Sequence, residues 1–282
     1  MEMWYTEFHT DTVKWSIKVD RSIYTDKSDF QRIDIFDTDE FGRVMTLDGL
    51  MMVNEKDQFI YHDMIVHVPM ATNPSIEKVL VIGGGDGGTV RELTRYKTIK
   101  KIDMVEIDEM VIKAAIKYLD YTSNKLSDER VNLYYEDGIE FVKGLKDEYD
   151  LIIVDSTDPI GPGEGLFTTE FYTNCYNALT ENGILINQKE SPYYEQTAHE
   201  MKRSHDKLST IFPVIMTYQY HMPTYPSGHW LFGFSSKGLN AIEDLDKDAW
   251  NALGLKTEYY NTDLHVGAFM LPNYVKELLN AE

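Results

Sequence analysis

The strongest constraint on the fold is an alternation of short apolar runs with helical patterns that begins after Pro74. Each run is apolar throughout, as are strands buried on both faces of a parallel sheet, so the alternation predicts a doubly wound α/β sheet. The expected strands are 79–82, 102–106, 131–135, 151–154 and 184–188, and a closing hairpin is expected from 214–220 and 230–235. The expected helices are 89–96, 108–119, 138–145, 168–179, about 193–211, and a last one near the C-terminus.

The first part of the chain, residues 1–65, alternates apolar and polar residues and so predicts β-structure. Strands are expected at 15–19, 31–36, 43–47 and 50–53. Asp48-Gly49 predicts a two-residue hairpin turn between the last two, because both turn positions favour positive φ. We therefore expect a small antiparallel β domain over residues 1–65 and an α/β domain over residues 66–282.

The net charge limits the classes of partner that the chain can bind, and the cysteine count indicates the redox state of its compartment. The 47 acidic and 27 basic residues give a net charge of −20, which repels nucleic acid and anionic membranes and attracts cations, unless it serves solubility alone. The single cysteine, Cys175, excludes an intramolecular disulfide and fits a reducing compartment. The segment MEMWYTE does not resemble a signal peptide, and no apolar run approaches the length of a membrane span. The expectation is a cytoplasmic protein without nucleic-acid or membrane partners.

A glycine-rich loop follows the first predicted strand of the α/β part. Gly83, Gly85 and Gly88 have the G-x-G-x-x-G spacing between a strand and a helix, where glycine permits a tight turn and lets a ligand approach the backbone. Dehydrogenases, flavoproteins and methyltransferases all carry versions of this motif. The loop alone therefore predicts a nucleotide-like ligand without choosing among these classes.

Acidic residues after the next two strands indicate the chemistry of the ligand more closely. Glu106 ends the second strand, 18 residues past Gly88, where a carboxylate accepts hydrogen bonds from both ribose hydroxyls of an adenosine. Asp137 and Gly138 follow the third strand, where a side chain and a backbone amide could read an adenine edge. The spacing predicts an adenosine-containing ligand.

Three further acids are expected at the same edge of the sheet. Asp86 lies inside the glycine loop, where it suits a cationic ligand tail or caps the following helix. Asp155 and Asp158 follow the fourth strand, and Asp158-Pro159 is also a good turn starter. Because ligands of open α/β sheets bind beyond the carboxyl ends of the strands, the three acids should converge on one crevice, where a polycation would relieve their repulsion.

Five motifs in order resemble the polyamine aminopropyltransferases, the spermidine synthase family. They are GGGDGG at 83–88, EID at 106–108, DG at 137–138, DSTDP at 155–159 and PTYPSG at 223–228. The resemblance covers nearly the whole chain and implies a Rossmann-like, methyltransferase-type, seven-stranded and mostly parallel sheet with a small N-terminal antiparallel β domain. It implies a transferase of alkyl groups other than methyl, which moves the aminopropyl group of decarboxylated S-adenosylmethionine to putrescine and gives spermidine and 5'-methylthioadenosine. It also implies no metal and no prosthetic group, and a homodimer or homotetramer.

The resemblance also implies roles for individual residues. The adenosine side would be held by Gln31, Glu106, Asp137, Gly138 and Pro162, together with the loop glycines Gly83 and Gly85. His62 and Asp86 would bind the aminopropyl ammonium, and Asp155 would be the base beside Tyr61 and Tyr225. The diamine would be bound by Asp155 and Asp158, together with Gln188 or Glu190.

Some alternatives stay open at this point. A methyltransferase that uses intact S-adenosylmethionine, a non-catalytic polyamine sensor and a dehydrogenase share parts of the pattern, although Asp86 in the loop disfavours an anionic ligand. The acceptor could be putrescine, cadaverine, agmatine or spermidine. The Pro- and Gly-rich stretch 159–167 is expected to close over the occupied cleft, unless it is only a long connection.

Overall fold

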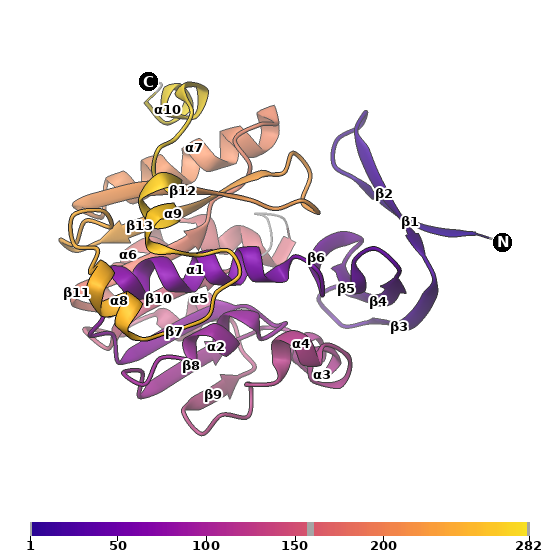
Figure 1. Cartoon of the computed structure of the whole chain (residues 1–282), viewed down its shortest axis with the longest axis horizontal. Coiled ribbons are helices and arrows are strands. Elements are labelled where there is room, and N and C mark those ends of the chain that lie inside the picture. Colours follow the sequence, from indigo (N-terminus) through magenta and orange to yellow (C-terminus); the bar gives the residue numbers. More distant parts are fainter. Residues whose placement is uncertain (1, 157–160, 281–282) are drawn as a thin grey trace.

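The computed structural model describes residues 2–156 and 161–280 and shows an α/β part with a β part beside it (Figure 1). The α/β part is built on one seven-stranded sheet, as predicted. In spatial order its strands are β12 (Val214–His221), β13 (His229–Ser236), β11 (Leu179–Gln188), β10 (Tyr149–Asp155), β7 (Lys78–Gly83), β8 (Lys101–Val105) and β9 (Val131–Tyr134). The five strands from β11 to β9 are parallel, and the β12–β13 hairpin is antiparallel.

The central strands are buried on both faces, which explains their continuous apolar sequence. In β7, Val79 and Val81 pack into one core, while Leu80 and Ile82 pack into another on the opposite face. The first face is covered by α1 (Gln58–Thr72), α2 (Gly88–Leu93), α8 (Lys247–Ala252) and α9 (Thr262–Ala268). The second face is covered by α5 (Gly138–Val142), α6 (Thr169–Ala178) and α7 (Glu195–Ser209). The remaining elements are α3 (Glu109–Tyr118), α4 (Asp120–Ser123), the 3₁₀ helix η1 (Gly161–Phe167) and α10 (Asn273–Asn280).

Helix α1 was not among the predicted helices, and it is the element that joins the two parts of the chain. All but one of its residues are buried, so it has no polar face and no helical periodicity in the sequence. It runs through residues 65 and 66, where the domain boundary is expected, and the division into two domains stays a prediction. Within the described ranges no helix is long and apolar enough to cross a membrane.

The N-terminal part contains one four-stranded antiparallel sheet and a separate hairpin. The sheet has β3 (Arg21–Lys27), β4 (Arg32–Thr38), β5 (Gly42–Leu47) and β6 (Leu50–Asn54), and the hairpin has β1 (Met3–Phe8) and β2 (Lys14–Val19). The Asp48-Gly49 turn is confirmed, with φ of 49° and 83°. Ile33 and Ile35 of β4 pack on α3, and through this contact the sheet packs against the α/β part. Strands β1 and β3 were not predicted.

Candidate active site

A cavity of about 400 Å³ lies beyond the carboxyl ends of β7, β8 and β10 and is closed on one side by β5 and β6 of the N-terminal sheet. It brings together most of the residues that the sequence singles out. They are Gln31, Tyr61, His62, Gly83, Gly85, Asp86, Glu106, Asp137, Gly138, Asp155, Gln188, Glu190 and Tyr225. Asp158 and the side chain of Pro162 lie outside the described residues, so their expected roles stay predictions. The same holds for closure of 159–167, of which η1 contributes Gly163 and Leu166 to the cavity wall.

Asp155, at the end of β10, is held by one hydroxyl on each carboxylate oxygen. The Tyr61 hydroxyl donates to Oδ1 at 2.7 Å, and the Thr89 hydroxyl donates to Oδ2 at 2.6 Å. Burial raises the pKa of this carboxyl, and the negative charge of Asp86 raises it further. Asp155 is therefore a fixed carboxylate with more affinity for a proton than an exposed aspartate has.

Strand β7 ends at Gly83, a position where the structure requires glycine. The φ of this glycine is +84°, and a Cβ there would lie 2.2 Å from the backbone oxygen of Asp155. The Gly84 amide donates to that same oxygen at 2.8 Å. The loop and the end of β10 therefore approach backbone to backbone, which only a glycine at position 83 permits.

His62 and Asp86 form a pair of possible acceptors at the start of α2. His62 Nε2 lies 3.4 Å from Asp86 Oδ1, and both side chains are largely buried. Asp86 Oδ1 also accepts from the Gly88 amide at 2.8 Å, so Asp86 caps the start of α2 as well. Asp86 therefore stabilises the start of α2 through Oδ1 and also lines the cavity.

The opposite side of the cavity is built from the acids after β8 and β9. Burial raises the pKa of Glu106 to about 7, and the charges of Asp108 and Asp155 add to this. Gln31 donates from Nε2 to Asp108 Oδ2 at 3.0 Å, which ties the N-terminal part to the loop after β8. Asp137 accepts from the Ile139 amide at 2.8 Å and so also caps α5. Gln31, Glu106 and Asp137 line the cavity where the sequence predicts adenosine binding.

Aromatic side chains form the wall next to Asp155. The Tyr61 ring lies 6.4 Å from that of Tyr225 and 5.0 Å from that of Phe232, edge to face. The Tyr225 hydroxyl donates to the backbone oxygen of Met52 in β6 at 2.6 Å. The wall is therefore shared between the last hairpin of the large sheet and the N-terminal sheet.

The end of β11 supplies the remaining predicted residues. Gln188 is 5% exposed and Glu190 is 1% exposed, and Glu190 has a φ of 71°, a strained value for this residue type. Lys189 between them donates to His205 Nδ1 and to the Thr217 hydroxyl at 2.9 and 2.8 Å. These two contacts hold Lys189 away from the cavity lining, and its neighbours Gln188 and Glu190 line the cavity.

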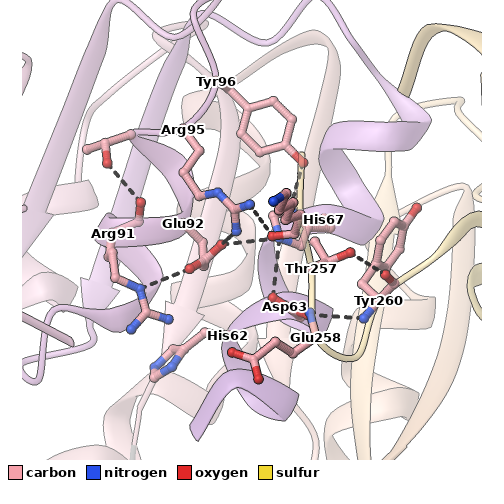
Figure 2. A network of polar contacts seen from close by, with 12 residues as sticks. His62, Asp63, His67, Arg91, Glu92, Arg95, Tyr96, Thr257, Glu258 and Tyr260 are labelled. Carbon is pink, nitrogen blue, oxygen red and sulfur yellow. Dashed lines mark hydrogen bonds and ion pairs between the residues drawn. The ribbon is translucent and has the colours of Figure 1, made fainter. Parts of the chain in front are cut away.

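A second polar cluster lies behind the cavity, between α1 and α2 (Figure 2). Asp63, His67 and Glu92 place one nitrogen and two carboxylate oxygens within 4.8 Å of one another, a spacing that metal ligands can have. The carboxylates are already engaged, however. Arg91 and Arg95 pair with the two oxygens of Glu92, and Asp63 Oδ2 accepts from the backbone amides of residues 258, 259 and 260. Two guanidinium groups balance two carboxylates, so the donor set fits a buried ion cluster better than a metal site.

Three residues that contact the site were missed in the sequence. Thr89 binds Asp155, Gln58 binds His62, and Arg91 binds Gln58. Thr89 gives no signal, since nothing in a first-turn threonine tells where its hydroxyl points. Gln58 stands four residues before His62, so a helix predicted over 58–72 would have revealed that pair.

Comparisons with known proteins agree with this geometry. A family model described as "Spermine/spermidine synthase domain" matches residues 58–245, and one described as "Spermidine synthase tetramerisation domain" matches residues 3–55. A polyamine aminopropyltransferase of Clostridium botulinum (strain Eklund 17B / Type B) is 68% identical over 280 residues, 99% of each chain. Another, of Clostridioides difficile (strain 630), is 64% identical over 283 residues, 100% of each chain.

Two solved structures are similar along the whole chain. A spermidine synthase in complex with the transition state analogue AdoDATO has a TM-score of 0.96 and 44% identity, over 99% of this chain and 96% of that one. A spermidine synthase from Thermotoga maritima has a TM-score of 0.93 and 42% identity, over 99% and 95%. The likeness therefore extends over both the N-terminal and the α/β part.

Proposed function

Because the chain belongs to the spermine/spermidine synthase family and is a polyamine aminopropyltransferase, we propose that it transfers the aminopropyl group of decarboxylated S-adenosylmethionine to putrescine. The products are spermidine and 5'-methylthioadenosine. Family membership decides against the methyltransferase, polyamine-sensor and dehydrogenase alternatives.

The observation that carries the proposal is the acidity of the cavity beside the glycine loop. Asp86 and Asp155 both line the cavity beside the glycine loop, where we place the tail of the cofactor in this proposal. An anionic tail would be repelled there, whereas an aminopropyl ammonium would be attracted. Glu106, Asp137 and Gln31 would hold the adenosine portion at the far side.

The chemical difficulty lies in the nucleophile. A sulfonium is already a good leaving group, but an alkyl ammonium has a pKa of about 10.4, so freeing its lone pair at pH 7 costs roughly 4.6 kcal/mol. The fixed positive charge of the sulfonium and partial desolvation both lower the pKa of the attacking amine. Positioning two cations in one site then supplies much of the remaining acceleration.

Asp155 is the group proposed to take the proton. Its raised pKa makes it a better base than an exposed aspartate, and the hydroxyls of Tyr61 and Thr89 fix both of its oxygens. A positioned base contributes roughly 10²- to 10⁴-fold to the rate. Tyr61 and Tyr225 would line the path of the amine next to it.

The assembly and the compartment belong to the same proposal. The matched tetramerisation domain spans residues 3–55, and the β1–β2 hairpin exposes several large apolar side chains, so we propose a homodimer or homotetramer built through this part. Cys175 is fully buried with a free thiol whose pKa is raised by burial, which fits the proposed cytoplasmic location.

A panel of acceptors tests the proposed reaction. The chain is incubated with decarboxylated S-adenosylmethionine and one of putrescine, cadaverine, agmatine or spermidine, and the aminopropylated products are measured by mass spectrometry. The proposal predicts the highest kcat/KM with putrescine. A higher kcat/KM with another amine would replace putrescine as the acceptor while leaving the transfer itself in place.

A further inference from the structure

The amide of Gln58 is oriented by two contacts to the same atom. Arg91 donates from Nη2 to Gln58 Oε1 at 3.0 Å, and His62 Nδ1 lies 2.8 Å from that oxygen. A guanidinium has only donors, so the atom facing Arg91 must be the amide oxygen and not the nitrogen. An amide oxygen only accepts, so His62 Nδ1 must carry the proton that is donated to it.

Arg91 is itself held in place from two sides. Its Nε donates to Glu92 Oε1 at 2.9 Å, and its Nη1 donates to the backbone oxygen of Tyr121. Figure 2 shows Glu92 between Arg91 on one side and His67 on the other. The guanidinium therefore cannot rotate away from Gln58 without breaking the ion pair to a carboxylate that is 4% exposed.

The imidazole of His62 is fixed by packing as well. A Cβ at position 88 would lie 2.1 Å from His62 Cε1, so the ring fills the space that the third loop glycine leaves open. In the Nδ1–H tautomer of an imidazole, Nε2 carries a lone pair. His62 Nε2 lies 3.4 Å from Asp86 Oδ1, and both residues line the cavity.

We propose that Arg91 is a positioning residue which, through Gln58, holds His62 as the Nδ1–H tautomer, so that His62 Nε2 and Asp86 together bind the aminopropyl ammonium. The opposite tautomer would point an N–H at the ammonium and repel it. Arg91 thus contributes to the choice of a cationic tail over a neutral or carboxylated one without contacting the substrate. This inference rests on the proposed function, since it concerns the tail of decarboxylated S-adenosylmethionine.

The variant Arg91→Met tests the inference. Without the guanidinium the amide can turn its NH₂ toward His62 Nδ1 and favour the other tautomer. The expected result is a KM for decarboxylated S-adenosylmethionine raised roughly 10- to 100-fold, the effect of losing a hydrogen bond to a charged group. The affinity for 5'-methylthioadenosine, which lacks the aminopropyl group, should change less than about threefold.

Further variants separate positioning from general damage. Gln58→Met frees His62 Nδ1 while leaving the Arg91–Glu92 ion pair intact, so it should reproduce the KM effect even if Arg91→Met does not fold. Arg95→Met removes the other guanidinium on Glu92 but no contact to Gln58, and it should leave the ratio of the two ligand affinities unchanged. The conservative Arg91→Lys should recover part of the lost affinity.

The tautomer is read directly from ¹⁵N shifts in protein labelled at histidine, with His62→Asn used to assign the signals. The inference predicts Nδ1–H for His62 in the wild type and an increased share of Nε2–H in Arg91→Met. An Nε2–H signal in the wild type, or an unchanged ligand ratio in both Arg91→Met and Gln58→Met, would overturn it. If the wild type shows no preference for decarboxylated S-adenosylmethionine over the carboxylated form, the proposed function itself fails, which is a different outcome.

Discussion

At the scale of single residues, the site depends on carboxylates whose surroundings set different tasks. Asp155 has its two oxygens fixed by hydroxyls and a raised pKa, Glu106 has a pKa of about 7, and Asp86 accepts from a backbone amide at a helix start. The identity of these acids could be predicted from the sequence, because each follows a strand or lies in the glycine loop. Thr89, the hydroxyl partner of Asp155, could not be predicted, since the contact joins two distant segments.

The first prediction concerns the proposed base. Asp155→Asn should lower kcat roughly 10²- to 10⁴-fold, because an amide cannot take the proton from the attacking amine. The affinity for 5'-methylthioadenosine and the melting temperature should stay close to those of the wild type. Asp263→Asn, the same change at a side chain that is 94% exposed, is the matched control and should leave kcat unchanged. A kcat within threefold of the wild type in Asp155→Asn would show that another group accepts the proton.

The second prediction concerns Glu106. The folded chain keeps its proton up to about pH 7, while the unfolded chain loses it near 4.5. The folded state therefore binds more protons in this window, and this group makes the free energy of unfolding fall as pH rises from about 5 to 7, by at most about 1.4 kcal/mol per pH unit.

The Glu106→Gln variant isolates that contribution, since every other titratable group is present in both proteins. Denaturant unfolding at several pH values should give a difference in free energy, wild type minus variant, that declines toward pH 7 and is constant above it. Parallel curves for the two proteins would contradict the raised pKa.

At the scale of elements, a strand could be predicted where its residues are all buried or are alternately buried and exposed. Helix α1 could not be predicted. The five parallel strands stand out as short apolar runs, and Asp48-Gly49 marks its hairpin. Helix α1 is buried on all sides and contains Pro69, so neither periodicity nor propensity indicates a helix. Strand β3 is mostly exposed and lacks the apolar alternation on which the prediction depended.

The third prediction concerns the packing of α1 on α2. Gly88→Ala should push the His62 ring out of place, because the new Cβ would lie 2.1 Å from Cε1. We expect the KM for decarboxylated S-adenosylmethionine to rise by about tenfold or more, with a smaller change in the affinity for 5'-methylthioadenosine. Gly267→Ala in α9 is the control, because a Cβ there meets no atom within 4 Å. Equal kinetics for Gly88→Ala and the wild type would mean that the ring can move without cost.

At the scale of the whole molecule, the net charge and the exposed apolar side chains favour different kinds of partner. The net charge of −20 suits cationic substrates, whereas the β1–β2 hairpin presents Met3 and Trp4 at 46% and 57% exposure. Figure 1 shows the N-terminal end of β1 pointing away from the α/β part, whereas the turn of the hairpin contacts that part through His9, whose ring lies 4.2 Å from that of Tyr194. Large apolar side chains at this exposed end support the subunit contact proposed above.

The fourth prediction follows from that surface. The double variant Met3→Ser/Trp4→Ser should shift the protein toward smaller species in sedimentation velocity, because it removes apolar area from the proposed subunit contact. Leu253→Ser, at a side chain of similar exposure in the α/β part, should leave the sedimentation profile unchanged. An unaltered profile for the double variant would place the subunit contact elsewhere.

The central claim is that an acidic cavity selects a cofactor with a cationic tail and transfers its aminopropyl group to a diamine. The most direct test is a competition assay in which the chain, putrescine, and equal concentrations of decarboxylated and carboxylated S-adenosylmethionine are mixed and all products are quantified by mass spectrometry. We predict spermidine and 5'-methylthioadenosine in equal amounts and no methylated amine. Methylated putrescine with S-adenosylhomocysteine, or tighter binding of the carboxylated cofactor, would contradict the claim.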